Sequence, residues 1–343
     1  MRHRRIARPP ARREGRQIFA DHLARFADRD GDARLVRIAA RVAEPPAVEV
    51  CGRPGVGVRT VTGALTAAGL RVGAPGAVAV LVIAEVLKPE DSARLAELSR
   101  GGRPVVVVFN KADLAGSGRG GPMATARRRA ATLQESAGVA VVPMVALLAE
   151  VELSAQWVSA LRVLAAEPAD LTSVDAFVTG AHRVPGAVRA QLLARLDRFG
   201  IAHATLALSR GADAGTLPAE CRRLSLVDQV CAAVHTAAAP VRYHRMRWAL
   251  AELRALAAAR EDASVGRFLS ADETVLASMA AAVDVVQADG MTVDPGVERH
   301  DHLRRAQRWR HYRDGPVGRL HRSCADDIVR GSLRRMAGAG GGR

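Results

Sequence analysis

The strongest constraint on the fold is an alternation of short apolar runs with helical segments between residues 46 and 166. Val105–Phe109 is continuously apolar and rich in β-branched residues, and Ala47–Cys51 and Val78–Ala84 are similar. Such runs are typical of strands buried on both faces of a parallel sheet. The sequence therefore predicts an α/β fold with a compact parallel sheet. Helical spacing predicts helices near Thr60–Ala68, Pro89–Ser99, Thr125–Ala137 and Ser154–Ala165.

A glycine-rich loop follows the first predicted strand. Gly52, Gly55 and Gly57 lie between that strand and the next predicted helix. The segment resembles the phosphate-binding loop of P-loop GTPases, G-x-x-x-x-G-K-[ST], in which the lysine neutralises phosphate charge and the hydroxyl binds Mg²⁺. Here Val58 occupies the lysine position and Arg59 the hydroxyl position. A valine carries no charge and an arginine cannot ligate Mg²⁺, so the resemblance implies damaged phosphate and magnesium sites.

Two alternatives stay open for this loop. If it bulges by one residue, Arg59 and Thr60 take the lysine and hydroxyl roles, although a forked guanidinium is not a clean replacement for an ammonium. The loop can also be a plain Gly/Pro turn between strand and helix, with no ligand.

Asn110-Lys111-Ala112-Asp113 follows the predicted strand Val105–Phe109 at its carboxyl end, where α/β folds bind ligands. The segment resembles the N-K-x-D motif of translation-factor and Era-like GTPases. The resemblance implies that Asp113 accepts hydrogen bonds from guanine N1 and N2, that Asn110 steadies the base and the loop, and that the Lys111 stem packs against the ring. Only two of the 50 Lys and Arg residues are lysines, so the other 48 are arginines and a lysine here is less expected by chance. The alternative is a polar turn that ends a strand.

The other motifs of that family are weaker. Gly73-Ala74-Pro75-Gly76 resembles the magnesium-binding D-x-P-G motif with its aspartate lost. The stretch from Thr60 to Gly73 is too short for a usual switch I, so no switch threonine is assigned. Pro143-Met144-Val145-Ala146 resembles the final S-A-K motif with only the alanine kept, which adds Ala146 to the predicted nucleotide-binding residues. A plain turn and a plain buried strand are the alternatives.

Composition limits the class of protein. A length of 343 residues predicts two or three domains, and a formal charge of +15 predicts attraction to nucleic acid, anionic lipid or acidic proteins. The four cysteines lack metal-ligand spacing and no secretory signal is evident, which favours the cytoplasm. The longest apolar run, Val139–Ala149, is too short to span a bilayer. The Ala/Arg/Gly-rich composition is typical of a GC-rich, actinobacterium-like genome.

The predicted divisions are a basic N-terminal arm and helix (1–45), a GTPase-like P-loop domain (46–166), a mainly helical domain (167–337) and a disordered tail (338–343). A helical pattern over Gln17–Val42 is interrupted by an acidic turn. Ser270 and Glu273 predict a capping box for a helix that Gly290 ends. Further helices are predicted over Gly186–Phe199, Leu224–Ala238, Val241–Ala259 and Ala271–Ala288.

An arginine-rich segment near the C-terminus is the predicted partner surface. Arg304, Arg305 and Arg308 cluster with other arginines around Trp309 and Tyr312, and arginine and aromatic side chains are suited to interfaces. The alternative is an amphipathic helix pair whose arginines are simply solvated.

The sequence favours a GTPase-like regulatory protein with degenerate phosphate and magnesium sites. Weak binding of GTP or GDP is expected without Mg²⁺ and without catalytic residues, and the protein would act through a protein partner such as an intact GTPase. One alternative is a divergent active GTPase, a GTP hydrolase that uses Arg59 and Thr60. The other is a basic adaptor on a G-domain scaffold that contacts nucleic acid or anionic membrane. The expected location is the cytoplasm, with peripheral membrane attachment left open.

Overall fold

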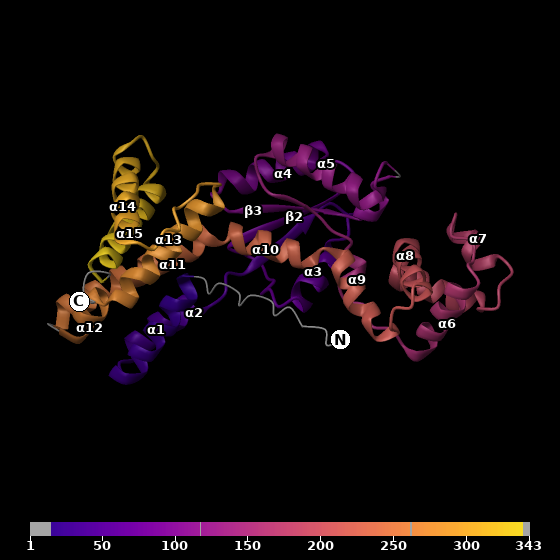
Figure 1. Ribbon diagram of the computed structural model, residues 1–343, viewed down its shortest axis with the longest axis horizontal. Coiled ribbons are helices and arrows are strands. Elements are labelled where there is room, and N and C mark those ends of the chain that lie inside the picture. The colour runs from indigo at the N-terminus through magenta and orange to yellow at the C-terminus, as the bar shows by residue number, and fades with distance from the viewer. Residues whose placement is uncertain (1–14, 117, 261–262, 339–343) are drawn as a thin grey trace. The chain divides into compact units, whose positions relative to one another are not determined.

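A computed structural model describes residues 15–116, 118–260 and 263–338. Its contacts group the chain into two units, coloured by residue number in Figure 1. The helical unit comprises Met1–Pro46 and Ala238–Arg343, and the sheet unit comprises Ala47–Ala237. The grouping differs from the sequence-based division, because residues 167–237 belong with the sheet and the N-terminal helices belong with the C-terminal ones. Residues 1–14 of the predicted basic arm and 339–343 of the predicted tail lie outside the described residues.

The sheet unit contains a parallel sheet, which confirms the α/β prediction. Its strands β1 (Val48–Gly52), β2 (Val78–Ala84), β3 (Val105–Asn110) and β4 (Val141–Pro143) lie side by side in chain order. Every residue of β3 is buried, and so is β2 except at its last residue. Burial on both faces explains the continuous apolar runs in the sequence. All four strands end at the same edge of the sheet, which is called the carboxyl edge below.

Helices cover both faces of this sheet. Figure 1 shows α4 and α5 on one face and α3 and α10 on the other. The bounds are α3 (Val58–Ala67), α4 (Pro89–Arg100), α5 (Gly121–Ala137), α6 (Ala155–Ala166), α7 (Val174–Thr179), α8 (Gly186–Ser209), α9 (Leu217–Ser225) and α10 (Val227–Ala237), with short 3₁₀ helices η1 (Ala112–Leu114), η2 (Ala146–Leu148) and η3 (Ala214–Thr216).

One predicted helix of this unit is wrong. The sequence predicts a single helix over Leu224–Ala238, but Leu226 takes a left-handed conformation with φ 60° and separates α9 from α10. The Ser225 hydroxyl, which is fully buried, accepts a hydrogen bond from the Val227 N–H at 3.2 Å. A side chain thus satisfies one of the backbone donors that the start of α10 leaves free.

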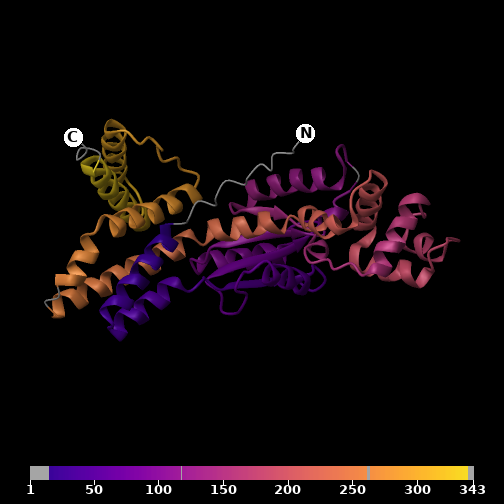
Figure 2. The ribbon, with the colours of Figure 1, turned by 60° about the horizontal axis from the view of Figure 1, so that its bottom comes forward.

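The helical unit has its own buried core. Here α1 packs on α2 and α13, α2 packs on α11, and α14 and α15 pack on each other and lie side by side in Figures 1 and 2. The Asp32 carboxylate accepts from the Arg34 N–H at 2.7 Å and caps α2, so the acidic turn ends one helix and starts the next. The bounds are α1 (Gly15–Asp30), α2 (Ala33–Ala43), α11 (Ala239–Arg260), α12 (Ala263–Ser270), α13 (Asp272–Ala288), α14 (Arg299–Asp314) and α15 (Arg319–Gly338).

The predicted capping box of α13 is wrong. The helix begins after Ala271, and the Ser270 hydroxyl instead donates to the carbonyl oxygens of Gly266 and Arg267 in α12. Glu273 pairs with His22 Nε2 of α1 at 2.8 Å. A tertiary contact therefore takes the side chain that the local pattern assigned to a cap.

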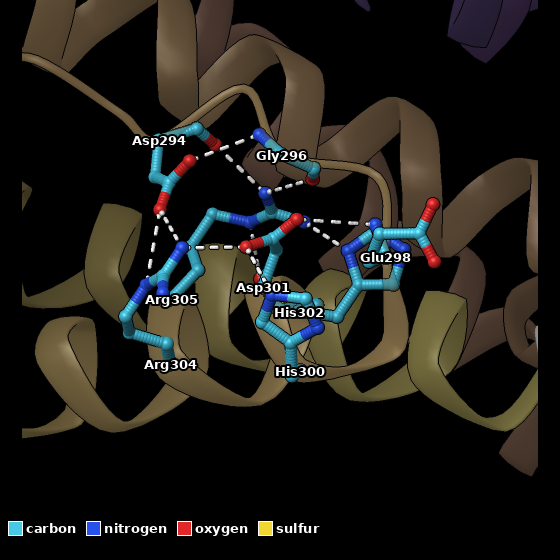
Figure 3. A network of polar contacts seen from close by, with 9 residues as sticks. Asp294, Gly296, Glu298, His300, Asp301, His302, Arg304 and Arg305 are labelled. Carbon is cyan, nitrogen blue, oxygen red and sulfur yellow. Dashed lines mark hydrogen bonds and ion pairs between the residues drawn. The ribbon is translucent and has the colours of Figure 1, made fainter.

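Arg305 is buried within the helical unit and is not part of a partner surface (Figure 3). Its guanidinium donates to the carbonyl oxygens of Asp294 at 2.7 Å and Gly296 at 3.0 Å. It also donates to Ser332 Oγ at 3.0 Å and to His302 Nδ1 at 2.6 Å. Only 2 % of Arg305 is exposed. Its hydrogen bonds to the loop carbonyls and to Ser332 hold the loop before α14 against α15.

Arg304 is engaged in the same network. It pairs with Asp294 at 3.2 Å and with Asp301, whose Oδ2 accepts from the Glu298 N–H at 3.2 Å and caps α14. The prediction that Arg304, Arg305 and Arg308 form one partner surface is wrong for Arg305, because its donors are already used inside the fold. Arg308 remains exposed.

We expect Arg305→Met to lower the free energy of unfolding by about 3 kcal/mol or more. The substitution removes hydrogen bonds to buried acceptors, each costing about 1–3 kcal/mol when left unsatisfied. Arg308→Met is the matched control, and an exposed substitution of this kind usually changes stability by less than about 0.5 kcal/mol. Urea unfolding measures both, and equal stability of the two variants would contradict the structural role of Arg305.

Candidate functional site

A cavity of about 240 Å³ lies at the carboxyl edge of the sheet. Its walls come from the start of α3, the end of β3 with η1, the η2 segment and the middle of α8. The lining residues are Gly57, Thr60, Asn110, Lys111, Asp113, Leu114, Val145, Ala146, Leu147 and Asp197.

The cavity brings together six of the predicted nucleotide-binding residues, namely Gly57, Thr60, Asn110, Lys111, Asp113 and Ala146. The other three, Gly52, Gly55 and Arg59, do not line it. The structure therefore assembles the residues of the N-K-x-D-like segment with part of the glycine-rich loop, and Arg59 is exposed outside the cavity.

The Asn110 side chain connects three segments at this edge. It is the last residue of β3 and only 4 % exposed. Its Nδ2 donates to the Val56 carbonyl oxygen at 2.9 Å, and its Oδ1 accepts from the Ala146 N–H at 3.1 Å. The loop after β1 and the η2 segment are thus both fastened to β3. The bond to Val56 is the loop contact that the N-K-x-D resemblance implies for Asn110.

Gly57 is required by this arrangement. Its φ is 94°, which favours glycine, and a Cβ added there would lie 2.4 Å from Asn110 Nδ2. The loop backbone can approach Asn110 only because Gly57 has no side chain. Directly after it α3 begins at Val58, so Thr60 lies in the first turn of the helix and on the cavity wall.

Asp113 places a half-buried carboxylate in the cavity. Lys111 takes a left-handed conformation with φ 56°, and the Ala112 N–H donates to the Met144 carbonyl oxygen at 3.1 Å, which fixes η1. Burial raises the pKa of Asp113, and the nearby charge of Asp197 raises it further. A ligand that brings N–H donors to this carboxylate would replace the water that the ionised form has lost.

Asp197 is a cavity residue that the sequence did not reveal. It lies within α8 but has φ 53° and ψ 175°, a conformation that is strained for a residue other than glycine. Its Oδ1 accepts from the Arg198 N–H at 2.5 Å. The sequence predicts a regular helix over Gly186–Phe199, in which Asp197 is an ordinary polar position, and no local pattern marks the break.

The loop before the cavity has its own ion pair. Arg53 Nε donates to Asp91 Oδ1 at 2.8 Å, and Asp91 Oδ2 accepts from the Lys88 N–H at 3.0 Å at the start of α4. Asp91 is only 1 % exposed. Both charged groups are therefore engaged in holding the loop against α4.

The segment Gly73–Gly76 lies away from the cavity. It precedes β2, and the Gly76 N–H approaches Glu49 Oε2 at 3.4 Å near the start of β1. That is the amino edge of the sheet, so the resemblance to a magnesium-binding D-x-P-G loop has no geometric counterpart. Within the described ranges, no group of three or more His, Cys, Asp or Glu side chains is placed to hold a metal ion.

Comparison with protein-family models, curated proteins and solved structures finds no match to this chain. In the part of the chain that the structure describes, no helix is both long enough and apolar enough to cross a membrane.

We expect Asp197→Asn to lower the pKa of Asp113, because it removes a negative charge that disfavours ionisation. The pKa should stay above the ordinary value, since burial is the larger cause and is unchanged. A ¹³C NMR titration of labelled aspartate carboxyl groups measures the change. Asp213→Asn removes an exposed carboxylate outside the cavity and should leave the titration of Asp113 unmoved. An unchanged Asp113 titration in Asp197→Asn would show that the two carboxylates do not interact.

Proposed function

We propose that this chain is a GTPase-like regulatory protein that binds the guanine base of GTP or GDP in the cavity and does not hydrolyse GTP efficiently. The observation that carries the proposal is the pair of hydrogen bonds from the Asn110 side chain to Val56 and Ala146, called the clamp below, which lies beside the Asp113 carboxylate. In the GTPases that the N-K-x-D segment resembles, the corresponding residues read guanine.

The preference for guanine follows from the acceptors that the cavity offers. Guanine presents N–H donors at N1 and N2, whereas adenine presents a lone pair at N1. A carboxylate is an acceptor only, so it accepts from the N1 and N2 donors of guanine and is repelled by the N1 lone pair of adenine. Because Asp113 is partly desolvated, donors from a ligand are worth more to it than they would be in water.

The phosphate side lacks the corresponding charges. Val58 stands at the lysine position, Arg59 lies outside the cavity, and Arg53 is paired with Asp91. The N–H groups at the start of α3 still offer weak attraction to an anion. Removing one electrostatic contact to a transition state commonly costs about 2.7–4 kcal/mol, so hydrolysis should be negligible. Such a protein would act through a partner, and an intact GTPase is the kind of partner that a degenerate relative fits.

A second candidate function is a divergent GTPase that uses Arg59 and Thr60. The placement of Thr60 on the cavity wall favours it. The two functions differ in their need for Mg²⁺ and in turnover, which makes them separable by direct measurement.

We expect Asp113→Asn to weaken GDP binding by roughly tenfold to a hundredfold, because a hydrogen bond to a charged group contributes about 1.5–3 kcal/mol. The same substitution should move the preference toward xanthosine diphosphate, whose C2 oxygen accepts from the new amide. Competition against a fluorescent GDP analogue measures both, with Asp213→Asn as control. Equal affinity of the wild type for ADP and GDP would contradict a guanine site.

We expect chelation of Mg²⁺ to change GDP affinity by less than roughly threefold, because the described residues hold no group of three or more His, Cys, Asp or Glu side chains that could bind the ion. Single-turnover GTP hydrolysis should not exceed the rate without protein. Measurable turnover that Mg²⁺ supports and Arg59→Ala abolishes would instead establish the divergent GTPase.

A further inference from the structure

A groove with two adjoining hollows runs between α2 and α11 in the helical unit. One hollow of about 380 Å³ is lined by Arg34, Arg37 and Arg41 of α2, with the small Ala255 and Ala259 of α11 among the residues opposite. The other, of about 200 Å³, is lined by Arg41 together with Trp248 and Arg245 of α11. Arg41 belongs to both hollows and joins them. This feature is called the α2–α11 groove below.

The arginines form a row along α2. Arg34, Arg37 and Arg41 are three and four residues apart, so they share one face of the helix at intervals of about 4.5 and 6 Å along its axis. Arg34 and Arg37 are exposed, and their guanidinium groups have no hydrogen bond or ion pair with any described residue. Their donors are free for a ligand, in contrast to those of Arg305.

Trp248 supplies a flat apolar surface in the second hollow. It is 43 % exposed, which is unusual for so large an aromatic side chain. The Arg41 guanidinium lies 3.8 Å from its ring centroid and also bonds to Glu252 at 2.7 Å. Arg245 donates to the Glu44 carbonyl oxygen at 2.8 Å. These contacts hold both arginines beside the indole. Arg41 lies over one face of the ring, so the rest of the indole is the part open to a ligand.

Net charge concentrates in the same unit. Its sequence carries 30 arginines against 19 Asp and Glu residues, a net charge of +11, whereas 20 basic and 16 acidic residues give the sheet unit only +4. The groove therefore lies in the unit whose overall field attracts polyanions.

We propose that the α2–α11 groove binds single-stranded nucleic acid, with the backbone phosphates on Arg34 and Arg37 and a base stacked at Trp248. Forked guanidinium groups match phosphate oxygens, and every base can stack on an aromatic ring without regard to sequence. An acidic peptide would satisfy the arginines, but it would fill the Trp248 hollow with a ring only if an aromatic residue stood at that position, whereas every nucleotide carries one. The small Ala255 and Ala259 leave room for a strand to lie along the helix pair.

The test uses the full-length protein and a short fluorescein-labelled oligo(U) RNA, followed by fluorescence anisotropy at several salt concentrations. We expect the double variant Arg34→Ala/Arg37→Ala to weaken binding by roughly tenfold at low salt. It should also reduce the slope of log affinity against log salt by roughly 1.4, since each single-strand phosphate contact contributes about 0.7.

Trp248→Ala should weaken binding roughly tenfold without reducing that slope, and Trp248→Phe should retain most of the affinity because it keeps a ring.

The matched control is Arg254→Ala/Arg322→Ala, which removes two exposed arginines of the same unit outside the groove. Circular dichroism confirms that each variant is folded. Three results would overturn the proposal: no binding of oligo(U) by the wild type at low salt, an equal loss in the control variant, or tighter binding of poly-aspartate that is lost in the same groove variants. The last result would assign the groove to an acidic protein.

Discussion

The cavity at the carboxyl edge depends on the two hydrogen bonds of the Asn110 side chain. They join the loop after β1 and the η2 segment to the end of β3. A buried amide with both ends paired is stable, whereas an apolar residue of similar size would leave the Val56 carbonyl and the Ala146 N–H without partners. The same contact explains Gly57, because any side chain there would collide with Asn110. One neutral side chain thus ties two segments of the cavity wall to β3 and excludes a side chain at residue 57.

In the proposed function, this dependence separates the residues that would bind the base from those that would face the phosphates. The clamp and the Asp113 carboxylate need neither the lysine nor the hydroxyl that a complete P-loop provides. In the proposed function, the absence of those groups removes charge that would face phosphates, but it leaves the bonds that shape the cavity in place. The loop after β1 is also held to α4 by the Arg53–Asp91 ion pair. The residues that would bind a base are therefore held independently of those that would face phosphates, and that physical separation supports the proposed function.

The sequence predicted those parts of the structure that local pattern controls. Continuous apolar runs predicted the strands, since burial on both faces leaves no alternation. The segment Asn110–Asp113 supplies three of the ten lining residues, because it lies at the carboxyl end of one buried strand. Asp197 was missed, since the break in α8 falls at an aspartate that is flanked by leucine and arginine, with no glycine or proline next to it. The association of α1 and α2 with the C-terminal helices was missed for a related reason: contacts between distant segments have no local signature.

Arginines show most clearly what composition cannot decide. Arg305 and Arg37 are chemically identical and both lie in arginine-rich helices, yet one is almost completely buried and the other exposed. Arg305 has carbonyl, hydroxyl and imidazole acceptors around it, and these replace the water that its charge lost on burial. Arg37 has no such acceptors among the described residues and is exposed, so its donors face solvent and are open to a ligand. A cluster of arginines in a sequence is therefore a candidate interface only where the fold leaves their donors unused. By that criterion α2 is a better candidate than the buried side of α14.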